Sequence, residues 1–185
     1  MDNFNLEPLG PKHKKQFLSF TDQFIGNNYF NDDSFEKQIQ LSLKNNLNCS
    51  FVLINEVNNI IGIRLTYAPG LWTNDIKTKY INNSIDLNSV AYFKSLFIDP
   101  DYQKKGLGPL LSNKSIEVLK KMGATHILSH SWKESPNNSS VRYLEKWGFK
   151  PLGEISNFWF DIDYLCAGCN LKNCTCTSVE MLYSI

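Results

Sequence analysis

Residues 90–108 read VAYFKSLFIDPDYQKKGLG and contain the strongest structural signal of the chain. Residues 90–99 are rich in apolar, aromatic and β-branched side chains, which predicts a strand. Pro100 ends this strand. Gly106 and Gly108 then precede a segment with apolar residues at helical spacing. The stretch therefore predicts a strand, a tight turn and the start of a helix.

The glycine-rich turn, residues 103–108, has the physical properties of an anion-binding site. Glycine allows backbone angles that point several N–H groups into one concavity, and a helix N-terminus adds about half a positive charge. Lys104 and Lys105 add two full charges nearby. The turn is not a P-loop, and it lacks the third glycine of a dinucleotide fingerprint because that position is Leu111. Taken alone, the pattern is also compatible with a simple tight turn.

A second motif, NNSSVRYLEKWGF, occupies residues 137–149. Residues 94–108 resemble the central motif of the GNAT superfamily of acyl-CoA-dependent N-acyltransferases, in which a hydrophobic strand and Asp-Pro precede Gln/Arg-x-x-Gly-x-Gly/Ala. Residues 137–149 resemble a later helix of that family, Asn-x-x-Ala/Ser-x-x-x-x-Glu-Lys-x-Gly-Phe. The resemblance covers about residues 50–165, with the two motifs in the family's order and separated by a predicted helix and strand.

The resemblance implies that acetyl-CoA is the cosubstrate. Its pyrophosphate would bind the backbone N–H groups of the turn, and its pantetheine arm would pair with the preceding strand. The implied function is transfer of an acetyl group to a primary amine of an unidentified acceptor, a small molecule or a peptide, by direct attack in a ternary complex. The cofactor-binding residues are then Leu96, Phe97, Ile98, Gln103, Lys104, Lys105, Gly106, Leu107, Gly108 and Asn137.

Outside the motifs, the pattern predicts a single domain over residues 1–185. A short strand, two helices and a hairpin of residues 50–55 and 60–67 are expected in the first half. The second half alternates β-α-β-α and ends with two strands, at 151–164 and 177–185. This order predicts an α/β (α+β) domain, with a mostly antiparallel mixed central sheet flanked by helices, as in the GNAT fold.

Acyl transfer to an amine needs a general base. His130 and Glu134, near the end of a strand expected at 125–132, are the catalytic candidates; a surface or hydrogen-bonded strand histidine and a solvated glutamate are the structural alternatives. Many family members carry a tyrosine acid four residues before the glycine of Gly-Phe, but Leu144 holds that position here. Tyr143 is expected to pack in the core or at the sheet edge, because one residue turns a side chain by about 100° on a helix.

Four of the five cysteines, Cys166, Cys169, Cys174 and Cys176, crowd into residues 166–176. Two close pairs of thiolates suit tetrahedral Zn²⁺ and leave no coordination position open. A structural zinc knuckle is therefore predicted at the tip of the last β-hairpin. Two disulfides, which a reducing compartment disfavours, and four unpaired thiols are the alternatives. The GNAT pattern does not require this cluster.

The composition argues against several other classes of protein. The 185 residues include 19 basic and 18 acidic side chains, net charge +1, and only two arginines, so no nucleic-acid partner is expected. No apolar run approaches the ~18 residues of a membrane-spanning helix, and no secretory signal is recognised. A cytoplasmic monomer or homodimer without a membrane partner is predicted. The rival functions are a non-catalytic CoA-binding sensor on the same fold and a zinc-knuckle protein-interaction module.

Overall fold

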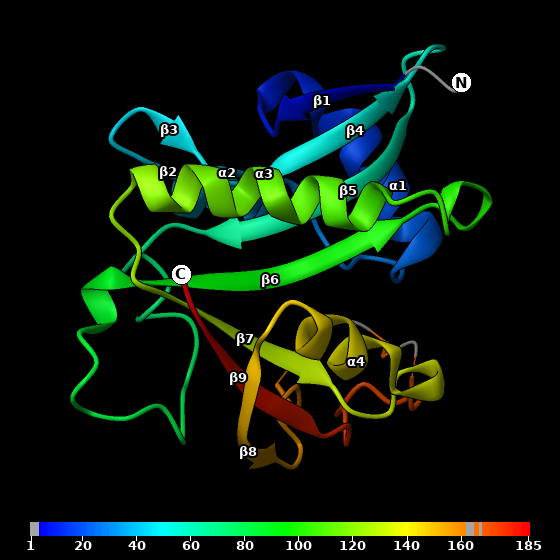
Figure 1. Ribbon diagram of the computed structural model, residues 1–185. Helices are drawn as coiled ribbons and strands as arrows, with labels where there is room; N and C mark the ends of the chain where they lie inside the picture. Colours follow the sequence, from blue (N-terminus) through cyan, green and yellow to red (C-terminus); the bar gives the residue numbers. More distant parts are fainter. Residues whose placement is uncertain (1–3, 162–164, 167) are drawn as a thin grey trace.

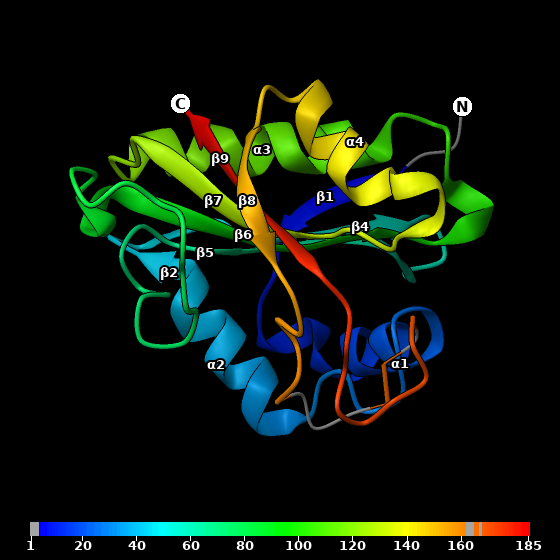
Figure 2. The ribbon, with the colours of Figure 1, turned by 90° about the horizontal axis from the view of Figure 1, so that it is seen from below.

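The computed structural model describes residues 4–161, 165–166 and 168–185. Seven strands form one mixed sheet in the order β1-β4-β5-β6-β7-β9-β8. Helices α1 and α2 cover one face of the sheet, and α3 and α4 lie on the opposite side (Figures 1 and 2). The predicted fold class is confirmed. Among the described residues, no helix combines the length and the apolar character needed to cross a bilayer.

The first half of the chain forms both helices of one face and three neighbouring strands of the sheet. Its elements are β1 (Phe4–Pro8), α1 (Lys14–Phe24), α2 (Asp32–Ser42), β2 (Leu43–Lys44), β3 (Leu47–Asn48), β4 (Phe51–Asn55) and β5 (Ile60–Tyr67). The second half supplies the other four strands and both helices of the other face. Its elements are β6 (Val90–Ile98), α3 (Leu107–Lys121), β7 (His126–Trp132), α4 (Ser139–Lys146), β8 (Lys150–Ile155) and β9 (Ser178–Ser184).

Asparagines in the left-handed backbone region account for the differences from the predicted elements. Asn45 and Asn46, at φ 53° and 60°, turn the unpredicted β2–β3 hairpin. Asn137, at φ 54°, delays the start of α4 to Ser139. The strand predicted over 151–164 ends at Ile155 and is followed by a turn containing Asn157 at φ 56°; its last residues, 162–164, lie outside the described part of the chain.

Strand β5 forms the centre of the hydrophobic core, because all eight of its residues are buried. On one face, Ile63 and Leu65 pack in a cluster with the aromatic residues of α1 and α2, including Phe17 and Phe35. On the other face, Ile61 packs in a cluster with Leu107, Leu111 and Leu119 of α3. Burying each such side chain stabilises the fold by about 1.5–3 kcal/mol. The sheet and α3 are thereby held rigidly, and they position the site described next.

Candidate functional site

Strands β6 and β7 separate halfway along their length (Figure 1). They pair in parallel only from Val90 with His126 to Phe93 with Ser129, although both strands continue beyond these pairs. A bulge in β6 accompanies the separation: Thr66 of β5 pairs with Phe93 and Leu65 with Ser95, so Lys94 is the extra residue. A bulge bends a strand and disrupts its ladder. The part of β6 beyond the bulge, residues 94–98, therefore presents an edge with which an extended ligand can pair.

The end of β6 leads directly into the glycine-rich turn. Gln103 secures the turn, because its side-chain amide donates to the carbonyl of Ile98 at 3.1 Å. Lys104 at φ 62° and Gly106 at φ 77° lie in the left-handed region, which directs successive N–H groups into a concavity. Gly106 is the N-cap of α3, whose first-turn N–H groups have no partner within the helix. The predicted strand–turn–helix arrangement is present, and it favours an anion at this end of α3.

An open cleft of about 720 Å³ lies beside the turn. Six of the predicted cofactor-binding residues line it: Ile98, Gln103, Lys104, Gly106, Leu107 and Gly108. Lys105 points its ammonium toward the ring of Tyr102, 5.1 Å from the ring centroid. Asn137 lines a smaller neighbouring hollow, which shares Tyr143 and Lys146 with the first.

A second cleft, of about 280 Å³ and here called the central cleft, occupies the gap between β6 and β7. Residues 94–97 of β6 form one wall, so the predicted Leu96 and Phe97 lie here. His130 and Trp132 of β7 contribute a second side. The predicted cofactor-binding residues of β6 thus continue from the central cleft to the turn along one strand.

His130 is fully buried and engaged at both ring nitrogens. Its Nε2 lies 3.2 Å from a carboxylate oxygen of Glu180, and its Nδ1 lies 3.3 Å from the hydroxyl of Tyr92. Its ring stacks on Phe158 at a centroid distance of 4.1 Å. A carboxylate at Nε2 favours the tautomer with the proton on that nitrogen, so that Nδ1 can accept from Tyr92. His130 lines both the central cleft and an adjoining cleft of about 570 Å³ that also includes Tyr92.

Glu180 holds His130 and the loop after β5 together. Its carboxylate also accepts the N–H groups of Lys79 and Tyr80, both at 2.8 Å. Burial alone would raise the pKa of Glu180, but the hydrogen bonds from His130 and from these two N–H groups outweigh it and leave the pKa lowered. An ionised Glu180 therefore fixes the orientation of His130.

Glu134 has a different environment. It is exposed, and both of its carboxylate oxygens lie 3.0 Å from the backbone N–H of Thr177. Lys133 donates its own N–H to the carbonyl of Thr177. Glu134 thus secures the entrance to β9 at the end of β7. Of the two catalytic candidates, His130 is the one that lies on the clefts formed by the described residues.

Lys94 also belongs to the site, although the sequence motifs did not predict a role for it. It is half-buried at the bulge of β6 and lines both the central cleft and the adjoining one. Its ammonium lies 4.3 Å from the ring centroid of Phe30, and burial together with the charge of Lys37 lowers its pKa to about 8. A lysine that interrupts the apolar run VAYFKSLFI was the available sequence signal.

Tyr143 packs at the edge of the core, as predicted, and its hydroxyl lies 2.9 Å from that of Ser112 on α3. Leu144 is buried in the core. Neither residue lines the central cleft. The position at which many family members carry a tyrosine acid therefore provides no proton donor in this chain.

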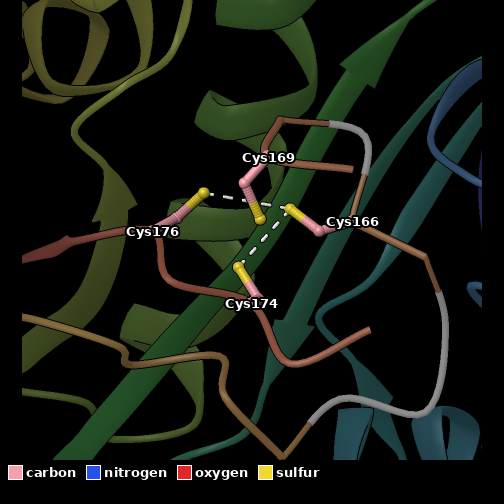
Figure 3. A group of neighbouring side chains, drawn as sticks. All are labelled: Cys166, Cys169, Cys174 and Cys176. Atoms are coloured by element: carbon pink, nitrogen blue, oxygen red, sulfur yellow. Dashed lines mark hydrogen bonds between the residues drawn. The ribbon is translucent and has the colours of Figure 1, made fainter. Parts of the chain in front are cut away.

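The four cysteines of residues 166–176 converge (Figure 3). All four sulfurs lie within 4.8 Å of one another, with Cys166 3.4 Å from Cys174 and 3.9 Å from Cys176. None forms a disulfide. Hydrogen bonds from the backbone at Thr175 and Leu171 lower the pKa of Cys169 to about 6, while burial raises the pKa of Cys176 to about 11. This group of side chains could hold a metal ion.

Known proteins share the fold and parts of the sequence. The model of the Acetyltransferase (GNAT) family matches residues 18–149. An uncharacterized N-acetyltransferase of Methanocaldococcus jannaschii is 31% identical over 77 residues, which span 42% of this chain but only 33% of that relative.

Solved structures match over nearly the whole chain. The acetyl-CoA complex of NAA60 from Arabidopsis thaliana has a TM-score of 0.69 at 13% identity, over 99% of this chain and all of the other. The ribosomal-protein-S18-alanine N-acetyltransferase of Escherichia coli has a TM-score of 0.66 at 17% identity, over 99% of this chain and 94% of the other. At these identities the likeness concerns the fold.

Proposed function

The chain belongs to the GNAT family of acetyltransferases, and on this basis we propose that it transfers an acetyl group from acetyl-CoA to a primary amine by direct attack in a ternary complex. The observation that supports the proposal best is the continuity of the site along one strand. The edge of β6 that faces the central cleft runs directly into the left-handed turn at the N-terminus of α3. A ligand with an extended amide arm and a diphosphate fits both features at once.

Each part of the site has a role in this proposal. The N–H groups of residues 103–108 hold the diphosphate, and the backbone of Leu96, Phe97 and Ile98 pairs with the arm. When bound, acetyl-CoA supplies the activated thioester. As the C–N bond forms and the C–S bond breaks, the proton of the amine passes through the Tyr92 hydroxyl to Nδ1 of His130. Solvent protonates the departing thiolate, because Leu144 has no proton to donate.

We further propose that the cysteine cluster binds Zn²⁺ as a structural ion. Four thiols at this spacing cannot all ionise without a cation to neutralise them, and thiolates select Zn²⁺ over harder ions. In a reducing cytoplasm, which we propose as the location, the alternative of two disulfides is disfavoured.

The acceptor is proposed to be an amine of a small molecule or of a peptide. One structural neighbour, Naa50 of Arabidopsis thaliana (TM-score 0.65, 14% identity, 98% of this chain and 99% of the other), is described in complex with the bisubstrate analogue CoA-Ac-MVNAL. A panel of amino acids, polyamines, aminoglycosides and peptides, assayed for release of free thiol from acetyl-CoA, tests the proposal. Thiol release that requires one class of amine supports it. Tight acetyl-CoA binding without release for any amine would instead favour the non-catalytic sensor.

A further inference from the structure

The cysteine cluster faces the centre of the molecule. Cys166, Cys174 and Cys176 line the central cleft together with residues 94–97 of β6 and with His130. The part of the chain that contains them, between β8 and β9, extends across to the face of the sheet covered by α1 (Figure 2). The sequence predicts a zinc knuckle at the tip of the last hairpin. In the structure, the cysteines of this tip form one wall of the central cleft.

The sulfur geometry matches one small tetrahedral cation. Four thiolates 2.3 Å from Zn²⁺ would lie about 3.8 Å apart. The sulfur of Cys166 lies 3.4 Å from that of Cys174 and 3.9 Å from that of Cys176, on either side of this spacing, and all four sulfurs lie within 4.8 Å of one another. A disulfide needs about 2.05 Å. The amide N–H of Gly168 also points at the sulfur of Cys166, at 3.4 Å, which suits a charged thiolate.

The cluster is fixed on one side to β7 and on the other to the residues that follow this strand. A Cβ atom on Gly168 would lie 2.3 Å from Cζ2 of Trp132, so the backbone at Gly168 rests directly on the indole ring. At the other end, Glu134 binds the N–H of Thr177, the residue after Cys176. A metal ion at the sulfurs would therefore lock these two attachment points into one rigid wall of the central cleft.

The opposite rim is formed by the connection between α1 and α2. Ile25 and Tyr29 line the same cleft, and the hydroxyl of Tyr29 lies 2.8 Å from that of Ser95. The cleft beside the turn lies further along β6 and, among the described residues, shares no lining residue with the central cleft. Disturbing the cysteine wall should consequently alter the central cleft and leave the turn unchanged.

We propose that the four cysteines bind one Zn²⁺ that builds the acceptor-side wall of the central cleft, so that the metal controls access of the amine but not binding of acetyl-CoA. The amine's use of this cleft rests on the proposed acetyl transfer. The metal ion takes no part in bond making, since four sulfurs fill its coordination sphere.

The first test measures metal binding. Purified protein should contain one Zn²⁺ per chain, and Co²⁺ in its place should give the intense sulfur-to-cobalt absorption of a thiolate site. Cys174→Ala should lose both signals. Cys49→Ala, the same change at a buried cysteine outside the cluster, should keep both. A protein that binds neither Zn²⁺ nor Co²⁺ overturns the inference.

The second test separates the two clefts by hydrogen–deuterium exchange and by calorimetry with acetyl-CoA. Removing Zn²⁺ with a chelator should raise exchange at least tenfold in residues 130–132, because the wall rests on Trp132, and should leave exchange in residues 103–108 unchanged. The dissociation constant for acetyl-CoA should change less than threefold. Unchanged exchange in residues 130–132, or a loss of acetyl-CoA affinity of more than threefold, contradicts the inference.

Gly168→Ala gives an independent check, because it moves the wall off Trp132 without removing any of the four cysteines. It should retain one Zn²⁺ and still raise exchange in residues 130–132; retained metal with unchanged exchange would argue against a wall seated on Trp132. If the metal protects the cleft as described but the zinc-loaded protein acetylates no amine, the wall is supported and the proposed acetyl transfer is refuted.

Discussion

Gly108→Glu should abolish most of the affinity for acetyl-CoA without unfolding the protein. A Cβ atom at Gly108 would lie 3.4 Å from Leu96 and 3.7 Å from Tyr143, which is ordinary van der Waals contact, and the backbone angle there is not left-handed. The added carboxylate would enter the cleft where the diphosphate is expected. One pair of like charges 4 Å apart costs about 1 kcal/mol in water and about 4 kcal/mol near a protein surface. For this open cleft we expect a loss of about 2–4 kcal/mol of binding free energy, which raises the dissociation constant roughly 30- to 1,000-fold.

Isothermal titration of acetyl-CoA into the parent protein and the variant measures this loss directly. Gly108→Ala is the matched control, because it adds the same Cβ without the charge and should change affinity less than about threefold. Thermal melting of all three proteins confirms that each is folded. Equal affinity of the parent protein and Gly108→Glu would refute the assignment of the turn as the diphosphate site.

Three further predictions concern His130, Glu180 and Arg64. His130→Gln should lower kcat about 100-fold or more while acetyl-CoA affinity stays within threefold, because only the proton acceptor is lost; an unchanged kcat in the thiol-release assay excludes that role. The folded state lowers the pKa of Glu180 below its unfolded-state pKa of about 4.5. The ionised carboxylate therefore adds fully to the free energy of unfolding above pH 4.5, and this stabilisation is lost as the pH falls through the folded-state pKa. Glu180→Gln should therefore lower Tm by about 2–6 °C at pH 7, with a difference that shrinks as the solution is acidified below pH 4.5; a difference that does not vary with pH would contradict this. Arg64 is buried over the ring of Phe93, with Nε and Nη2 lacking hydrogen-bond partners among the described residues, and burial lowers its pKa to about 9. Arg64→Met should leave Tm unchanged or raise it by up to about 4 °C, since a buried charge with two unsatisfied nitrogens is removed, and a fall of more than a few degrees would contradict this.

Most of the fold could be predicted because local signals and tertiary packing agree. The apolar run from Val90, the proline that ends it and the glycines at 106 and 108 each predict the same strand–turn–helix unit that the structure contains. The predicted elements differ from the observed ones where the backbone angle of a single residue decides whether a strand turns or ends. Asn45 and Asn157 adopt left-handed conformations that asparagine tolerates but does not require, so no composition pattern could predict the extra hairpin or the early end of β8.

The site was predictable only in part, because only some of its residues lie close together in the sequence. The turn is local in sequence, so its residues could be identified together. The partners of His130 come from β6 and β9, and neither Tyr92 nor Glu180 has a sequence signature that links it to a histidine on β7. The position of the cysteine cluster is equally nonlocal: the spacing indicates a metal site, but only the packing of Gly168 on Trp132 places it against the central cleft.

A crystal structure of the complex with acetyl-CoA would show directly which part of the protein binds the diphosphate. We expect density for the diphosphate within hydrogen-bonding distance of the backbone N–H groups of residues 103–108, with the arm alongside Leu96 to Ile98 and the acetyl group in the central cleft. Density for the nucleotide elsewhere on the molecule, with this turn unliganded at saturating acetyl-CoA, would contradict it.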